Sequence, residues 1–351
     1  MNVVLTGGGS GGHAFPAMAL AERAMGEGHE VRYFGSEEGI EHRLAIDKGI
    51  PFTPIPVGKL RRYWSWRNFI DPLRVVQGIW VSWRKLLKLP KASTVVYSFG
   101  GFVGLPVVVA AFLARRKCVL HEQTSRAGLA NRLSAPLVKR IFLSFETSRR
   151  FYPPRKTTVS GYPLRREFTE GRPTERVLEG RTYGVDGSPL LLVTGGGNGS
   201  RILNQWILRS LDRIPAGWRI LHLTGRSLFE EHRPFASDRY HPVPALFEGM
   251  ADFMRLSKAL VARGGAGTVS EIAFLKKPAV IVPLAIAQGN EQYHNAKEAS
   301  MRSPMKILTE SEIARADLWE TIDVLLRLPI PEPGPSIPQK SPVEILLQEA
   351  N

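Results

Sequence analysis

Residues 3–21, VVLTGGGSGGHAFPAMALA, limit the folds open to this chain more than any other stretch. An apolar, β-branched run at Val3–Leu5 is followed by five glycines within residues 7–12 and then by an apolar helical pattern. This order predicts a strand, a glycine turn and a helix whose first N–H groups are free to bind an anion. The glycine spacing also matches the G-x-G-x-x-G of dinucleotide-binding folds, although that match alone does not identify a ligand.

The same unit recurs twice further along the chain. The predicted strands Pro189–Thr194 and Ala259–Ala262 each run into another glycine turn that opens a helix. In the later helix, Thr268 lies in the first turn and Glu271 one turn on, on the same side. We therefore predict an α/β protein with two Rossmann-like, doubly wound parallel-sheet domains that face a cleft, with a boundary near residues 161–163.

Polar residues follow other predicted strands at the point where each strand ends. The strand Cys118–His121 runs into Glu122, Gln123 and Thr124. Parallel strands gather their carboxyl ends at one edge of a sheet, where open α/β folds bind ligands. Earlier in the chain, Glu37 follows another predicted strand and lies near the position of the ribose-binding acid of an NAD protein. A dehydrogenase therefore stays open as an alternative.

Composition excludes several classes of protein. The 351 residues contain one cysteine, Cys118, which excludes a disulfide framework and a cysteine-based zinc site. The longest apolar run, Phe102–Ala114, is too short to cross a bilayer, and no secretory signal is expected. These features predict two domains of ordinary size and no membrane span.

The net charge of +15 is unevenly distributed. Lys and Arg outnumber Asp and Glu by 14 in residues 1–162 and by 1 in the remainder. Such asymmetry indicates a polyanionic partner for the first half, either nucleic acid or an anionic membrane surface.

Residues 59–91 contribute much of this charge, with nine basic residues, one acid and four of the seven tryptophans. Trp and Leu at helical spacing beside Lys and Arg are typical of a helix that lies in the headgroup region of an anionic leaflet. We prefer this interpretation to a core helix with a solvated basic face, and place nucleic acid third because no nucleic-acid motif accompanies the segment. The predicted membrane patch consists of Arg74, Ile79, Trp80, Trp83, Arg84, Lys85, Leu87 and Lys88.

Seven ordered motifs resemble those of a known family: GGGSGGHAFPAMALA, FGGFVGLP, HEQTSRAGLANRLSA, GYPLR, GGGNGSRILN, RGGAGTVSEIAFLKKPAVIVPL and EQYHNA. They are similar to the bacterial family 28 glycosyltransferases that add N-acetylglucosamine from UDP-GlcNAc to undecaprenyl-pyrophosphoryl-N-acetylmuramoyl pentapeptide, called lipid I. The resemblance implies a GT-B fold and an inverting transfer that yields lipid II for peptidoglycan synthesis. It also implies a peripheral position on the cytoplasmic face of the inner membrane.

The same resemblance implies three regions in the chain. Residues 1–162 would bind the acceptor and the membrane, and residues 163–328 would bind the UDP-sugar donor. Residues 329–351 would form a proline-rich connector and a short C-terminal helix.

The departing UDP carries concentrated negative charge, which a protein stabilises with a metal ion or with fixed donors. No D-x-D pair occurs in the chain, which favours fixed donors and predicts no essential metal and no cofactor. The resemblance places the diphosphate at Ala266–Thr268 near Arg165 and the ribose on Glu271. It places the uracil beside Phe247 and the sugar hydroxyls on Gln292. The other donor contacts that it implies are Ser10, Gly11, Gly12, Thr124, Gly197, Asn198, Ala266, Gly267, Thr268, Val269 and Ser270.

An inverting displacement needs a base that takes the proton from the attacking 4-hydroxyl of the acceptor. His13 follows the first glycine turn and titrates in a suitable range, so we predict that it is this base or a donor to the acceptor's pyrophosphate. Glu122 is the competing base. The predicted acceptor-pyrophosphate site consists of Gly9, Ser10, Gly11, Gly12 and His13.

Some positions depart from the family pattern, namely Thr124, Tyr162, Gly197-Asn198 and Glu291. Most lie where substrate hydroxyls would be recognised, so they bear on fine specificity and not on the fold. Three alternatives stay open: a related GT-B enzyme acting on another membrane lipid such as diacylglycerol, an NAD-binding dehydrogenase, and a non-catalytic membrane or nucleic-acid binding module.

Overall fold

The computed structural model describes the chain except residues 59–66, 172–174, 185, 247, 332–341 and 350–351. The chain divides into two compact units, Met1–Arg165 with Pro338–Asn351, and Arg166–Ile337. The first unit thus extends to Arg165 and includes the C-terminal helix, which the sequence had placed in a separate region.

The first unit is built on a seven-stranded sheet with the order β3-β2-β1-β4-β5-β6-β7, in which every neighbouring pair is parallel. Val4 of β1 pairs with Arg32 of β2 on one side and with Val96 of β4 on the other. The strand order therefore reverses at β1, because β2 and β3 follow on one side of it and β4 to β7 on the other. Open α/β sheets bind ligands at such a point, so the expected place is beyond the carboxyl ends of β1 and β4. The strands are β1 Asn2–Thr6, β2 Glu30–Gly35, β3 Phe52–Pro54, β4 Thr94–Ser98, β5 Lys117–Glu122, β6 Arg140–Leu143 and β7 Thr157–Val159.

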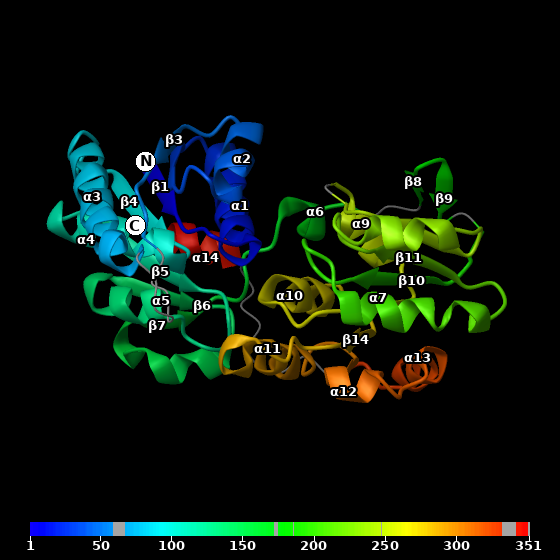
Figure 1. Ribbon diagram of the computed structural model, residues 1–351. Helices are drawn as coiled ribbons and strands as arrows, with labels where there is room; N and C mark the ends of the chain where they lie inside the picture. The colour runs from blue at the N-terminus through cyan, green and yellow to red at the C-terminus, as the bar shows by residue number, and fades with distance from the viewer. Residues whose placement is uncertain (59–66, 172–174, 185, 247, 332–341, 350–351) are drawn as a thin grey trace. The chain divides into compact units, whose positions relative to one another are not determined.

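Helices cover both faces of this sheet, because alternate residues of each strand are buried on opposite sides. Val3 and Leu5 pack in the cluster that contains α1, whereas Val4 packs with α4. The C-terminal helix α14 adds Val343, Ile345 and Leu347 to the α1 side and contacts α1 itself (Figure 1). The helices are α1 Gly11–Gly26, α2 Ile40–Asp47, α3 Arg67–Leu87, α4 Gly101–Leu113, α5 Leu129–Ser134 and α14 Pro342–Glu349.

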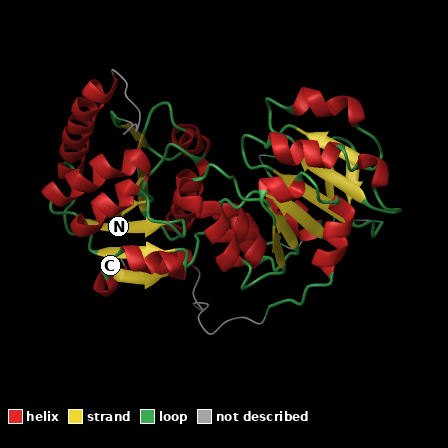
Figure 2. Ribbon diagram, turned by 60° about the horizontal axis from the view of Figure 1, so that its bottom comes forward, coloured by secondary structure: helices red, strands yellow, loops and turns green. Residues whose placement is uncertain are grey.

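The second unit repeats the plan with a six-stranded parallel sheet of order β12-β11-β10-β13-β14-β15. In both units the strands lie between layers of helices (Figure 2). The strands are β10 Leu190–Thr194, β11 Arg219–Leu223, β12 Tyr240–Val243, β13 Ala259–Ala262, β14 Ala279–Ile281 and β15 Met305–Ile307, with a separate hairpin of β8 Arg176–Leu178 and β9 Arg181–Tyr183. The helices are α6 Arg166–Thr169, α7 Arg201–Leu208, α8 Phe229–His232, α9 Met250–Leu256, α10 Ala266–Phe274, α11 Glu291–Ala299, α12 Glu310–Ile313 and α13 Leu318–Leu326.

Short 3-10 helices complete the two units: η1 Ala135–Leu137, η2 Glu146–Phe151, η3 Pro154–Lys156, η4 Leu211–Arg213, η5 Arg233–Phe235 and η6 Gln288–Asn290. The prediction of two Rossmann-like, doubly wound parallel-sheet domains is confirmed. In each unit the glycine turns lie at the carboxyl edge of the sheet.

Candidate active site

The first glycine turn connects β1 to α1 and packs tightly against the loop between β4 and α4. A side chain at Gly9 would place its Cβ 2.3 Å from the Phe102 ring, and one at Gly101 would meet the Gly8 carbonyl oxygen at 2.3 Å. Gly9 and Gly101 also have φ angles of 85° and 74°, which favour glycine. The turn and this loop therefore form one packed body beside the end of β1.

A buried carboxylate lies beneath this turn. Glu41 of α2 is fully buried and accepts hydrogen bonds from the backbone N–H groups of Gly9 and Ser36, both at 3.2 Å. The Gly9 N–H therefore points inward, which differs from its predicted use by a pyrophosphate. Ser10 and Gly12 are exposed, and the Ser10 side chain makes no cap bond, so the free donors at the start of α1 remain available.

His13 lies in the first turn of α1 with its ring orientation fixed by two oxygens. Its Nδ1 is 2.8 Å from the Phe99 carbonyl oxygen and 3.1 Å from Gln123 Oε1. Since a carbonyl oxygen can only accept, Nδ1 must carry the hydrogen, and the neutral ring has its lone pair on Nε2. The half-buried imidazole is thus in the form that a general base requires.

Glu122, the competing base, is buried and saturated by donors. Its carboxylate accepts from the N–H groups of Thr124 and Gly128 at 3.2 Å, the Thr124 hydroxyl at 3.1 Å, Asn131 Nδ2 at 2.9 Å and the Tyr152 hydroxyl at 2.6 Å. Burial, with the Glu122 charge next to it, raises the pKa of Tyr152 far above its usual value. These contacts make Glu122 the anchor of the loop after β5, which argues against its use as the base.

Thr124, predicted to contact the donor, contributes its side chain to the same anchor. Its hydroxyl lies within hydrogen-bond distance of Glu122 Oε1 and the Arg126 carbonyl oxygen. Thr124, a position that departs from the family pattern, therefore has its side-chain hydrogen-bond partners inside its own loop.

In the second unit, the turn after β13 also opens a helix, although β10 and not β13 holds the place in the strand order that β1 has in the first sheet. A Cβ at Gly264 would lie 2.4 Å from the Gln292 carbonyl oxygen, and Asn295 Nδ2 donates to the Gly264 carbonyl at 3.2 Å. The turn is therefore held against α11. It opens α10 at Ala266, which leaves Thr268 in the first helical turn and Glu271 one turn later, both half-buried.

Two side chains fix the segment between β14 and α11. Arg263 pairs with Glu310 at 2.7 Å and lies 3.2 Å from the Val282 carbonyl oxygen, a brace that the sequence did not reveal because its partners are distant in the chain. Gln292 Oε1 accepts from the Leu284 N–H at 2.9 Å. The predicted sugar-binding role of Gln292 would therefore use its amide nitrogen as a donor.

The other residues predicted to contact the UDP-sugar donor lie in different parts of the two units. Gly197 and Asn198 are exposed in the turn between β10 and α7. Arg165 belongs to the first unit, where its guanidinium lies 5.4 Å from the centre of the Phe15 ring on α1. Phe247 lies outside the described residues. Among the residues that the structure describes, no group of three or more His, Cys, Asp or Glu is placed to hold a metal ion.

Only some residues of the predicted membrane patch are well exposed to solvent. Trp80 and Leu87 of α3 are exposed, by 53% and 49%, and the Arg84 guanidinium lies 4.9 Å from the centre of the Trp80 ring. Ile79 and Trp83, in contrast, are partly buried and pack against the core. Ile79 and Trp83 therefore offer less of their surface to a membrane than Trp80 and Leu87 do.

Other large apolar side chains of α3 and α4 are also exposed. On α3 these are Leu73 and Val76, with 70% and 63% exposure, and on α4 they are Phe112 and Leu113. The basic members Arg74, Arg84, Lys85 and Lys88 are all exposed. Within the described ranges, no helix combines the length and hydropathy of a membrane span.

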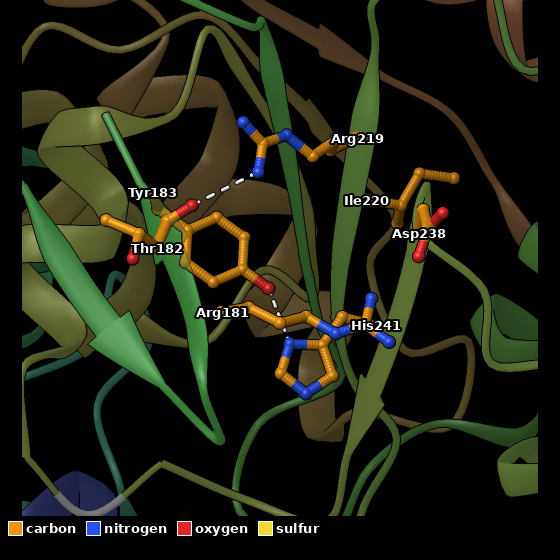
Figure 3. Close-up of a pocket in the computed structure, with 7 residues that line it drawn as sticks. All are labelled: Arg181, Thr182, Tyr183, Arg219, Ile220, Asp238 and His241. Carbon is orange, nitrogen blue, oxygen red and sulfur yellow. Dashed lines mark hydrogen bonds between the residues drawn. The ribbon is translucent and has the colours of Figure 1, made fainter. Parts of the chain in front are cut away.

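A hollow of about 230 Å³ lies at the opposite, amino-terminal edge of the second sheet (Figure 3). Two hydrogen bonds join residues of its lining: the Tyr183 hydroxyl bonds His241 Nδ1, and Arg219 donates to the backbone carbonyl of Thr182 at 3.1 Å. This position, away from the glycine turns, separates it from the candidate active site.

Comparisons with known proteins agree with this geometry. Residues 3–143 match the glycosyltransferase family 28 N-terminal domain and residues 190–330 match the family 28 C-terminal domain. A Clostridium botulinum (strain Langeland) protein is 34% identical over 92% of this chain and 90% of its own length, and a Clostridium tetani protein is 32% identical over 92% and 89%. Both are named UDP-N-acetylglucosamine--N-acetylmuramyl-(pentapeptide) pyrophosphoryl-undecaprenol N-acetylglucosamine transferase.

Solved structures of glycosyltransferases are similar to this chain as well. The crystal structure of Acinetobacter baumannii MurG superposes with a TM-score of 0.70 at 26% identity, over 93% of this chain and 92% of that one. The glycosyltransferase of kitacinnamycin has a TM-score of 0.63 at 13% identity, over 93% and 91%, which shows the shared fold alone.

Proposed function

The chain belongs to glycosyltransferase family 28, and we propose that it transfers N-acetylglucosamine from UDP-GlcNAc to the 4-hydroxyl of the N-acetylmuramoyl sugar of lipid I. The product is lipid II, the precursor of peptidoglycan. Membership of the family also removes the dehydrogenase alternative, which depended on the first turn and Glu37 alone.

The observation that carries the proposal is His13 at the start of α1, with Nδ1 within hydrogen-bond distance of two oxygens and with no hydrogen-bond partner at Nε2 among the described residues. Nε2 takes the proton of the acceptor's 4-hydroxyl while that oxygen attacks C1 of the donor sugar. The bond from C1 to the β-phosphate oxygen breaks, and its electron pair leaves with UDP. One displacement of this kind inverts the configuration at C1.

The two glycine turns bind the two substrates. Ser10, Gly11 and Gly12 offer their donors to the pyrophosphate of the acceptor, next to His13. The start of α10 stabilises the departing diphosphate through its free N–H groups and its dipole, and Glu271 accepts from the ribose hydroxyls. Fixed donors thus take the place of a metal ion, and the enzyme needs no metal or other cofactor.

The exposed face of α3 and α4 is the proposed contact with the anionic inner surface of the cytoplasmic membrane. Trp80, Leu87 and Phe112 would enter the headgroup region while the basic side chains around them meet anionic lipids. This contact supports a peripheral position, with the lipid-linked acceptor reached from the cytoplasmic side.

The test measures transfer of labelled N-acetylglucosamine to a short-chain lipid I analogue, in parallel with a diacylglycerol acceptor and with EDTA present or absent. We expect product with the first acceptor only, at the same rate with EDTA. Donor binding without transfer to the lipid I analogue would mean that the acceptor class is wrong, and transfer to diacylglycerol would favour the related lipid glycosyltransferase.

A further inference from the structure

His13 is the outer end of a chain of polar side chains that continues into the first unit. Gln123 Oε1 lies 3.1 Å from His13 Nδ1, while Gln123 Nε2 lies 2.9 Å from the His121 carbonyl oxygen and 3.2 Å from His121 Nδ1. At the inner end, His121 Nε2 lies 3.1 Å from the Gly161 carbonyl oxygen. Gln123 and His121 are both almost completely buried.

Backbone carbonyls fix the direction of every bond in this chain. The Gly161 oxygen can only accept, so His121 carries its hydrogen on Nε2 and accepts at Nδ1. The His121 carbonyl oxygen can also only accept, so the NH₂ group of Gln123 faces it and Oε1 faces His13. The orientation of the Gln123 amide is therefore determined without reference to His13.

We propose that Gln123 is a positioning residue of the transfer reaction, whose oriented amide oxygen acts with the Phe99 carbonyl to hold His13 as the Nδ1–H tautomer and stabilises the imidazolium formed when Nε2 takes the proton. His121 in turn orients Gln123. The proton moves only from the acceptor hydroxyl to Nε2, and the chain of bonds keeps its own hydrogens. The role of Gln123 in the transfer step rests on the proposed function, whereas the Nδ1–H tautomer of His13 does not.

The charges around His13 support this division of roles. Burial lowers the pKa of His121 to about 4, so its ring stays neutral near neutral pH and keeps Nδ1 as an acceptor. Glu41 lies beneath the turn, Arg165 lies beside Phe15, and Glu122 points to Tyr152 and Asn131. The hydrogen-bond partners of the His13 ring are two neutral oxygens, so amide dipoles and not a carboxylate stabilise its charged form.

The first test replaces Gln123 by methionine, which keeps the length of the side chain and removes its oxygen. A bond to a charged donor contributes more than a bond to a neutral one, so we expect kcat to fall about tenfold with the KM for UDP-GlcNAc unchanged. The acid limb of the kcat/KM profile should move about one pH unit lower, because the imidazolium loses an acceptor. The exposed Gln205→Met on α7 is the matched control and should leave both quantities unchanged.

The second test reads the tautomer directly in the wild-type protein by nitrogen NMR of labelled histidines, with His13→Gln to assign the signal. We expect hydrogen on Nδ1 in the neutral ring and a lower titration midpoint of His13 in Gln123→Met. Hydrogen on Nε2, or a midpoint and kcat unaffected by Gln123→Met, would overturn the inference.

These readouts separate the two claims. A protein that shows the Nδ1–H tautomer and a His13 titration midpoint that depends on Gln123, but transfers nothing to lipid I, would contradict the proposed function alone. A protein that transfers normally after Gln123→Met would contradict only the role of Gln123.

Discussion

The two glycine turns that begin α1 and α10 look alike in sequence but differ in the charge behind them. Beneath the first turn, the buried Glu41 carboxylate accepts a hydrogen bond from the Gly9 N–H. Before the second turn, Arg263 is paired with Glu310 at 2.7 Å. A buried carboxylate weakens the attraction of a helix start for a phosphate, which favours the second turn for the UDP diphosphate.

The turns also differ in the side chains that they present. The first carries His13, whose Nε2 is free to take a proton, whereas the second carries Thr268 and Glu271, which are suited to hold a nucleotide. In the proposed function, the first turn therefore supplies the base beside the acceptor, and the second binds the donor nucleotide.

The largest expected effect tests the chemical side of this comparison. His13→Ala should lower kcat by about 10²- to 10³-fold, because general-base catalysis contributes this much, with little change in the KM for UDP-GlcNAc. Steady-state kinetics with a lipid I analogue measure both constants. A variant that keeps near wild-type kcat and loses only acceptor affinity would make His13 a binding residue and not the base.

Unfolding at acid pH tests the buried histidines of the two units. Burial lowers the pKa of His121 to about 4 in the first unit and, with His232 adding to the effect, that of His222 to about 3 in the second. Below a pH of about 6.5 the unfolded chain binds protons that the folded units do not, so stability is lost as the pH falls toward these values.

At a pH of about 4.5, two units below the unfolded pKa, the loss should be about 2.5 kcal/mol for each histidine. Urea unfolding at neutral pH and at about pH 4.5 measures the free energy of unfolding. An unchanged value between these two conditions would show that the histidines are not held neutral by the fold.

The binding side is tested by Glu271→Ala, with Glu230→Ala on the surface of α8 as the control. Loss of hydrogen bonds between a carboxylate and the ribose hydroxyls should weaken UDP-GlcNAc binding about 10- to 100-fold while the acceptor KM stays constant. Calorimetric titration with UDP-GlcNAc gives the affinity. Equal affinities in the two variants would move the nucleotide away from α10.

The smallest effect concerns the charge beneath the first turn. In Glu41→Gln an NH₂ group must face either the Gly9 or the Ser36 N–H, which leaves one buried donor without an acceptor. We expect a loss of about 1–2 kcal/mol in stability and a fall in Tm of a few degrees, measured by thermal unfolding. An unchanged Tm would mean that the carboxylate does not hold the turn.

Local patterns gave the strands and helices because their causes are local. Strand β13 has the predicted bounds Ala259–Ala262, and β5 extends by one residue at each end beyond the predicted Cys118–His121. The glycine turns were also readable, since glycines after a β-branched run leave few other conformations. The ordered motifs then identified the family, which the comparisons confirm.

Periodicity was less informative on the membrane patch. It placed Ile79 and Trp83 with Trp80 on one surface, whereas packing against the core buries the first two in part. The sequence shows that a helix is amphipathic, but the neighbouring α4 decides which side chains stay in contact with solvent.

The sequence by itself determined the fold class, the two glycine turns, the family and His13 as the candidate base. Only the tertiary structure decided what surrounds those residues: Glu41 beneath the first turn, Gln123 at His13 Nδ1, and the saturation of Glu122. The reason is physical, because His13 and Gln123 are 110 positions apart and meet only when β1 and β5 bring their carboxyl ends to one edge of the sheet.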